Sequence, residues 1–209
     1  MVSQAESNRD RILAMDVLAT LSKLRDENQV VITHQGSARL WPQIADHSLD
    51  FHYNPSTMGG AVSFGLGIAI AQPKRDVLVV SGDGSLLMNL GSLVSVIASN
   101  TPNLSIVVLD NGTYEVTGGQ KTAAELIQLD FAKLAESIGF VTAWNIDGAM
   151  DHESKLRDFL ESDGPRFASV SVQAAELTGL AKTPLPIKQQ VARLTESLTA
   201  SEFRLDGHD

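Results

Sequence analysis

The chain contains no cysteine among its 209 residues. Disulfide bonds, thiolate zinc sites and cysteine-ligated iron–sulfur clusters are therefore excluded. A basic cluster is absent as well: 16 lysines and arginines stand against 25 acidic residues, which gives a formal net charge of −9. This charge balance argues against nucleic acid or an anionic membrane as the main partner.

Long hydrophobic runs are also missing. No apolar run approaches the ~20 residues that a helix needs to cross a bilayer, and the first residues, MVSQAESNRDR, are polar and lack a signal-peptide core. We find no internal repeat, low-complexity segment or clear linker. These features predict a soluble, cytoplasmic protein with one α/β domain over residues 1–176 and a C-terminal extension, residues 177–209, with one helix.

The most informative stretch covers residues 77–120. Apolar, β-branched runs at 77–80 and 104–109 predict buried parallel strands, and residues 86–99 between them have apolar side chains at helical spacing. Strand, helix and strand form a βαβ unit, which predicts an α/β fold with a doubly wound parallel sheet and helices on both faces. The polar turns that follow both strands then share one edge of the sheet, where such folds bind ligands.

The residues in these two turns indicate a diphosphate bridged by magnesium. Gly82 and Gly84 let the backbone bend sharply and approach a ligand closely. Free amides at the start of the following helix favour an anion. Asp83 and the side-chain carbonyl of Asn111 are hard oxygen donors, which suit Mg²⁺.

This pattern resembles the signature of thiamine-diphosphate enzymes. Gly82-Asp83-Gly84 is followed by the 25 residues 85–109 and then by Asp110-Asn111. The stretch DNGTYEVTGGQ, which begins at Asp110, is similar to the same segment of phosphonopyruvate and sulfopyruvate decarboxylases. The resemblance covers residues 30–174, most of the chain.

The resemblance implies two cofactors, thiamine diphosphate and Mg²⁺. It assigns Mg²⁺ to the side chains of Asp83 and Asn111 and to the backbone carbonyl of Thr113. The same resemblance implies that Met58, which lies 25 residues before Asp83, props the cofactor in a bent form and that the carbonyl of Ser56 binds its pyrimidine. The cofactor-binding residues implied in this way are His34, Gln35, Gly36, Ser56, Met58, Gly82, Asp83, Gly84, Ser85, Asn111, Thr113 and Tyr114.

The resemblance also implies decarboxylation of a small 2-oxo acid, with the cofactor ring as the electron sink. We expect Met58, Tyr114 and Glu115 to take part in catalysis. Tyr114 and Glu115 stand where the phosphonopyruvate relatives carry His-Asp, which weakens any transfer of substrate specificity. A solvent-facing pair on a mobile loop is an equally good interpretation of these two residues.

Enzymes of this family carry two similar α/β domains, and this sequence matches only the diphosphate-binding one. The other domain supplies a glutamate to the pyrimidine ring. In length and motif the chain resembles the β subunit of the split sulfopyruvate decarboxylase. This implies a hetero-oligomer with a separate pyrimidine-binding subunit, self-association, and an isolated chain that is inactive.

Several alternatives remain open. The same domain occurs in other thiamine-diphosphate carboligases and in β subunits of 2-oxoacid:ferredoxin oxidoreductases, although the latter usually carry cluster-ligating cysteines. A catalytically inactive binding module is a further alternative, which intact Asp83 and Asn111 disfavour. A transition-metal site at His47 and His52 is disfavoured because their spacing matches no metal motif.

Outside the central stretch, the pattern of apolar residues predicts the remaining elements. Small side chains at residues 59–69 indicate a helix packed closely on its neighbours, and residues 34–37 form a turn at a strand end. Apolar periodicity predicts helices at 8–28, 130–138, 151–160 and 187–198, and strands at 29–33, 141–146 and 167–172.

Overall fold

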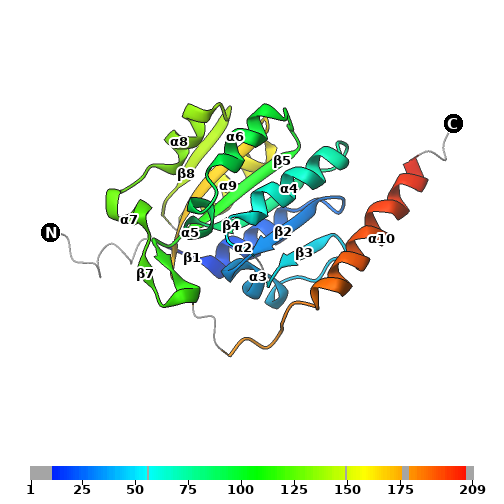
Figure 1. Ribbon diagram of the computed structural model, residues 1–209, viewed down its shortest axis with the longest axis horizontal. Helices are drawn as coiled ribbons and strands as arrows, with labels where there is room; N and C mark the ends of the chain where they lie inside the picture. The colour runs from blue at the N-terminus through cyan, green and yellow to red at the C-terminus, as the bar shows by residue number, and fades with distance from the viewer. Residues whose placement is uncertain (1–10, 56, 149, 176–178, 206–209) are drawn as a thin grey trace.

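A parallel β-sheet lies between two layers of helices in the computed structural model, which describes residues 11–55, 57–148, 150–175 and 179–205 (Figure 1). The strand order is β3-β2-β4-β5-β9, and both β1 and β8 also pair with β9. All pairings in this sheet are parallel, which confirms the predicted doubly wound α/β fold. The strands are β1 (Ile12–Leu13), β2 (Val30–His34), β3 (Asp50–Tyr53), β4 (Val77–Gly82), β5 (Leu104–Asp110), β8 (Thr142–Ile146) and β9 (Arg166–Gln173).

Each face of the sheet has its own hydrophobic core. Alternate side chains of a strand point to opposite faces, so Val77 and Val79 enter one core while Leu78 and Val80 enter the other. Burial on both faces explains why the central strands are continuous apolar runs. One core is covered by α4 (Gly60–Ala71), α6 (Gly91–Ala98) and α8 (Phe131–Ile138), and the other by α2 (Ala14–Leu24), α3 (Gly36–Leu40) and α9 (His152–Glu161).

The last helix, α10 (Ile187–Leu205), packs against the edge strand β3 (Figure 1). The side-chain oxygen of Gln190 accepts a hydrogen bond from the His52 amide at 2.6 Å, and Leu194 is buried in the first core. The helix therefore covers an edge that would otherwise be open to pairing. The expected domain boundary at residues 176 and 177 lies outside the described residues and stays a prediction.

The remaining elements are short. They are α5 (Asp83–Leu87), α7 (Ala123–Ile127), the short helices η1 (Trp41–Gln43) and η2 (Glu115–Thr117), and the hairpin strands β6 (Thr113–Tyr114) and β7 (Gln120–Lys121). Within the described part of the chain, no helix is both long and apolar enough to cross a membrane.

Several boundaries differ from the prediction. The first helix begins at Ala14, because Ile12 and Leu13 pair with β9 as a short strand. The helix predicted at 86–99 is divided into α5 and α6, with residues 88–90 between them. The hairpin β6–β7, strand β3 and helix α7 were not predicted, because each is only two to five residues long.

Candidate active site

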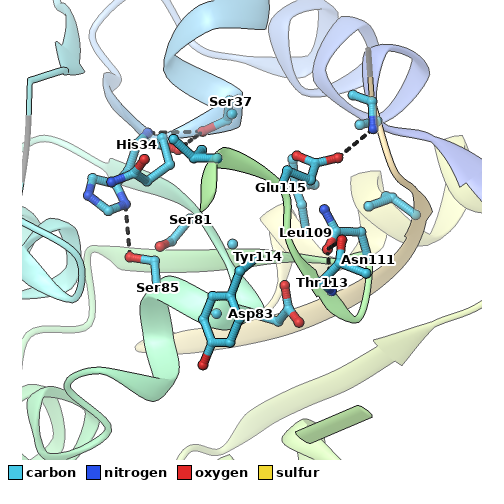
Figure 2. Close-up of a pocket in the computed structure, with 18 of the residues that line it drawn as sticks. His34, Ser37, Ser81, Asp83, Ser85, Leu109, Asn111, Thr113, Tyr114 and Glu115 are labelled. Carbon is cyan, nitrogen blue, oxygen red and sulfur yellow. Dashed lines mark hydrogen bonds between the residues drawn. The ribbon is translucent and has the colours of Figure 1, made fainter. Parts of the chain in front are cut away.

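The strand order reverses at the carboxyl ends of β2 and β4. From β2 the chain proceeds to β3 on one side, then returns past β2 to β4 on the other side. Open α/β sheets bind ligands at such a switch point. A cavity with roughly 640 Å³ of empty space, including its open mouth, lies there (Figure 2).

The predicted site residues come together in this cavity. All of the predicted cofactor, metal and catalytic residues line it except Ser56, which lies outside the described residues. They come from the ends of β2, β4 and β5 and from the turn before α4. Several lining residues were not predicted: Ala14, Ser37, Leu40, Ser81, Leu109, Val116, Thr117, Val172, Gln173 and Ala175.

Asp83 is a buried carboxylate at the end of β4, with only 1% of its surface exposed. Gly82 and Leu109 are the last paired residues of β4 and β5. Asp83 follows Gly82 and Asp110 follows Leu109, so the two carboxylates are neighbours across the strands. Burial, and then the negative charge of Asp110, raise the pKa of Asp83 to about 7. Burial also raises the pKa of Asp110. A divalent cation beside these groups favours their ionised forms, so the carboxylates fit a metal site.

Asn111 lines the same cavity as Asp83 (Figure 2). The side-chain oxygen of Asn111 accepts hydrogen bonds from the amide of Thr113 at 2.8 Å and from its hydroxyl at 3.1 Å. The bonds fix the orientation of the Asn111 amide group. A carboxylate, an amide oxygen and a backbone carbonyl are the hard donors that Mg²⁺ prefers, so these residues fit the metal predicted from the sequence.

His34 and Ser85 form a hydrogen-bonded pair on the opposite wall (Figure 2). His34 Nδ1 lies 2.9 Å from the Ser85 hydroxyl oxygen, which itself accepts a hydrogen bond from the Gly59 amide at 3.0 Å. This hydrogen bond joins the end of β2 to the start of α5. Burial lowers the pKa of His34 to about 4. A hydrogen bond to the Thr57 backbone opposes this fall in pKa.

Ser37 joins the ends of β2 and β4. Its hydroxyl oxygen lies 2.9 Å from the carbonyl oxygens of both His34 and Val80, and it accepts a hydrogen bond from the His34 amide at 2.9 Å. This single buried side chain fixes the spacing between the two walls of the switch point.

Met58 is held in the cavity by its neighbours in the turn. Gly59 has a φ of +84°, and its carbonyl accepts a hydrogen bond from the Asn89 side chain at 3.2 Å. A Cβ at Gly59 would lie only 2.7 Å from the Cβ of Asn89. The break between α5 and α6 thus places Asn89 against this turn, a role that the sequence did not indicate.

Tyr114 and Glu115 are half-buried and line the cavity, so a solvent-facing pair does not describe them. The Tyr114 ring packs on Gly84, where an added Cβ would lie 2.6 Å from the ring. The Glu115 carboxylate accepts a hydrogen bond from the Ala175 amide at 2.5 Å. Burial raises the pKa of Glu115, and the hydrogen bonds from Ala175 and Asn111 oppose this rise.

Thr122 was missed as a site residue. Its buried hydroxyl donates to Oδ2 of Asp83 at 3.1 Å and accepts from the Glu125 amide at 3.2 Å, which caps α7. The signal in the sequence is Thr122-Ala-Ala-Glu125, the pattern of a capping box.

The two histidines considered for a transition metal are engaged elsewhere. His47 Nδ1 lies 3.2 Å from the Arg25 guanidinium, and His52 Nδ1 lies 2.8 Å from the Thr33 hydroxyl. Asp50 forms an ion pair with Arg25. Across the described ranges, no three His, Asp or Glu side chains converge on a metal position.

The fold and the cavity together define a class: a doubly wound α/β protein with hard oxygen donors at its switch point. Residues 33–170 match the family described as thiamine pyrophosphate enzyme, C-terminal TPP binding domain, and the chain belongs to this family. Thiamine pyrophosphate is the same compound as thiamine diphosphate. The resemblance seen in the sequence is therefore confirmed, and thiamine diphosphate is the cofactor of the family.

Curated relatives support the same family. The chain is 43% identical over 148 residues to sulfopyruvate decarboxylase subunit beta of Methanothermobacter thermautotrophicus, which covers 70% of this chain and 75% of that protein. It is 36% identical over 183 residues to phosphonopyruvate decarboxylase of Streptomyces viridochromogenes, which covers 88% of this chain. The chain spans only 44% of that second relative, so it corresponds to less than half of it.

A solved structure shares the fold. It is the X-ray structure of a protein from Mycobacterium smegmatis assigned as a thiamin diphosphate-dependent enzyme, with a TM-score of 0.66 and 23% sequence identity. The match covers 78% of this chain and 32% of that one.

Proposed function

We propose that this chain holds the diphosphate end of thiamine diphosphate, together with Mg²⁺, in a decarboxylase that acts on a small 2-oxo acid. The observation that carries the proposal is the meeting of Asp83 and Asn111, from neighbouring strands, in one cavity with the backbone of Gly84. The names of the relatives support the reaction class: sulfopyruvate and phosphonopyruvate decarboxylases.

Three oxygen atoms would hold Mg²⁺: a carboxylate oxygen of Asp83, the side-chain oxygen of Asn111 and the backbone carbonyl of Thr113. Backbone amides of Gly84 and Ser85 would face the diphosphate, since amides at the start of a helix favour anions. The other wall of the cavity contributes His34, Gln35 and Gly36, and Gly82 completes the first turn. Ser56 keeps its expected role as a pyrimidine-binding carbonyl.

The bound cofactor supplies an electron sink for the pair of electrons released when the bond to the carboxylate breaks. Met58, which lines the cavity, would support the bound cofactor. Burial raises the pKa of Glu115, which favours the protonated form, and Tyr114 carries a hydroxyl in the same cavity. The reaction consumes one proton, since a 2-oxo acid becomes an aldehyde and CO₂, and Glu115 would deliver it.

The site also needs a second protein surface. We infer a separate pyrimidine-binding subunit that supplies the glutamate, in a hetero-oligomer, because one relative is named as a subunit beta. Exposed apolar side chains on and beside α4 and α6 offer a docking face: Ile70, Met88 and Val94 are each more than half exposed. Gly67 lies on the same face of α4 as Ile70 and is also exposed.

Native mass spectrometry of the protein purified from its source in Mg²⁺ tests the assembly. We expect a second chain with retained thiamine diphosphate and Mg²⁺. The complex should release CO₂ from 3-sulfopyruvate or phosphonopyruvate, and the isolated chain should not. Asp83→Asn should abolish retention of Mg²⁺ while the chain stays folded. Decarboxylation by the isolated chain, or full activity of Asp83→Asn, would contradict the proposal.

A further inference from the structure

The cofactor cavity has no positive side chain among the described residues that line it. Its charged side chains are those of Asp83 and Glu115, and both are carboxylates. An acidic group on a substrate that also carries a carboxylate would find no counter-ion from this chain there. Positive side chains that could recognise such a group must lie elsewhere.

A neighbouring cavity is lined by positive side chains instead of negative ones. It lies between α3, the turn at residues 54–55 and the segment at residues 179–184 that leads to α10, with roughly 830 Å³ of empty space including its opening. No carboxylate belongs to its described lining. Its lining residues are Arg39, Asn54, Pro55, Gly179, Leu180, Lys182, Thr183 and Pro184.

The two positive side chains of this cavity are not bound by other side chains or carbonyls of the described residues. Arg39 is half-buried and Lys182 is exposed, and within the described residues neither side chain makes a hydrogen bond or an ion pair. In a chain with a net charge of −9, two unpaired positive groups that share one cavity form a local concentration of positive charge.

Gln43 fixes the positions of both residues. Its side-chain nitrogen donates to the carbonyl of Arg39 at 3.1 Å and to the carbonyl of Lys182 at 2.7 Å. Its side-chain oxygen accepts from the Lys182 amide at 3.1 Å. One amide side chain therefore fastens the segment at residues 179–184 to α3 and holds the two positive residues on adjoining walls.

Nearby carboxylates do not cancel this positive charge. Asp46 and Asp50 line a separate cavity that shares Lys182. Asp46 pairs with Arg193 at 2.6 Å, and Asp50 is bound by Arg25. Because each carboxylate already has an arginine, Arg39 and Lys182 remain available to an outside anion.

We propose that Arg39 and Lys182 form an oxyanion-binding site for a sulfonate, phosphonate, sulfate or phosphate group. The planar guanidinium of Arg39 suits two oxygens of such a group, and Lys182 adds a flexible point charge. Thr183 and Asn54 supply neutral hydrogen-bond donors. The anion has two sources: the acidic tail of the substrate, which rests on the proposed function, or a free oxyanion.

This site adjoins the cofactor cavity through shared elements. Arg39 lies one turn after Gly36 on α3, and Gly36 lines the cofactor cavity. On the second wall, Asn54 lies four positions before Met58, which lines the cofactor cavity. An anion bound at Arg39 is therefore next to the walls that hold the cofactor.

Titration of the full chain with sodium sulfate, followed by backbone-amide NMR, tests binding directly. We expect saturable shifts at Gly179, Lys182 and Thr183, resolved from any shifts at Gly82 and Gly84. Arg39→Gln and Lys182→Gln should each weaken binding about tenfold, as expected for loss of one charge-assisted contact. Lys74→Gln, at an exposed lysine before β4, removes the same charge and should change nothing. Shifts that do not saturate, or that survive Arg39→Gln unchanged, would overturn the site.

Kinetics of the assembled enzyme separate the two sources. If the site binds the substrate tail, Arg39→Gln raises KM about tenfold for a 2-oxo acid with a sulfonate or phosphonate tail but not for pyruvate, and sulfate competes. If it binds a free oxyanion, KM is unchanged and the variant loses only the response to sulfate. A complex without decarboxylase activity contradicts the proposed function but leaves the sulfate titration as a valid test.

Discussion

Thr122 donates a hydrogen bond of 3.1 Å to the carboxylate of Asp83, although 39 positions separate the two residues in the chain. The hydroxyl favours the ionised form of a carboxylate whose pKa is raised by burial. It also accepts from the Glu125 amide and thereby connects the proposed metal-binding edge to the start of α7. This connection makes Thr122 the first residue to test.

Thr122→Val keeps the shape of the side chain and removes the hydroxyl. Without this donor, protons compete better for Asp83, and we expect Mg²⁺-dependent binding of thiamine diphosphate to weaken about tenfold. Loss of the cap should cost about 1 kcal/mol of stability. Calorimetric titration with the cofactor and thermal unfolding measure the two effects. Thr122→Ser, which keeps the hydroxyl, is the control and should bind normally; equal loss in both variants would show that the methyl group matters instead.

The buried ring of His34 predicts a pH-dependent stability. Its pKa is lowered from 6.5 to about 4 in the folded chain, so the unfolded chain binds a proton more readily. The neutral ring makes its full contribution to the free energy of unfolding above pH 6.5. This contribution is lost as the pH falls from 6.5 towards 4. The loss should reach roughly 3 kcal/mol, at about 1.4 kcal/mol for each unit of pKa shift.

Denaturant unfolding at pH 7.5, 6, 5 and 4.5 measures this effect. Carboxylates also titrate in this range, so the comparison is with His34→Gln, which has no ionisable ring. The stability difference between the two chains should narrow as the pH falls. A constant difference over the whole range would mean that the ring titrates normally.

The sequence predicted which residues share the cavity because its signals are local. Apolar runs followed by glycine-containing turns identify β4 and β5, and parallel pairing alone brings Asp83 and Asn111 to one edge. The contact of Thr122 with Asp83 could not be predicted, because it depends on the path of the β6–β7 hairpin between them.

The boundaries that were wrong depend on distant partners. Ile12 and Leu13 continue the apolar pattern of α2, and only their pairing with β9 makes them a strand. The break before α6 depends on the contact between Asn89 and Gly59, 30 positions away. The position of α10 depends on Gln190 and the edge of β3. The spacing of apolar residues describes one helix or strand at a time, so it cannot predict contacts between distant elements.

Two glycines of α4 provide a matched test of the proposed docking face. A Cβ at Gly67 would meet no atom within 4 Å, whereas a Cβ at Gly65 would lie 2.2 Å from a methyl carbon of Val79. Gly67→Leu should therefore leave the isolated chain folded, and the gain in helix propensity is up to about 1 kcal/mol. The bulky side chain should nevertheless weaken association with the partner subunit, as measured by analytical ultracentrifugation. Gly65→Ala should lower stability by about 1–3 kcal/mol through overpacking. Normal association of Gly67→Leu would place the interface elsewhere.

The close packing of Tyr114 on Gly84 allows a double-mutant test of the loop at 113–117, which lines the cavity. A Cβ at Gly84 would lie 2.6 Å from the ring, so Gly84→Ala must displace Tyr114 and, with it, the neighbouring Thr113 carbonyl that we propose binds Mg²⁺. We expect thiamine diphosphate to bind at least tenfold more weakly, measured by calorimetry in Mg²⁺, since interacting residues couple by about 0.5–3 kcal/mol. Adding Tyr114→Ala removes the clash and should restore much of the affinity. If the double variant binds as poorly as Gly84→Ala, the alanine acts on the diphosphate directly and the loop is not the cause.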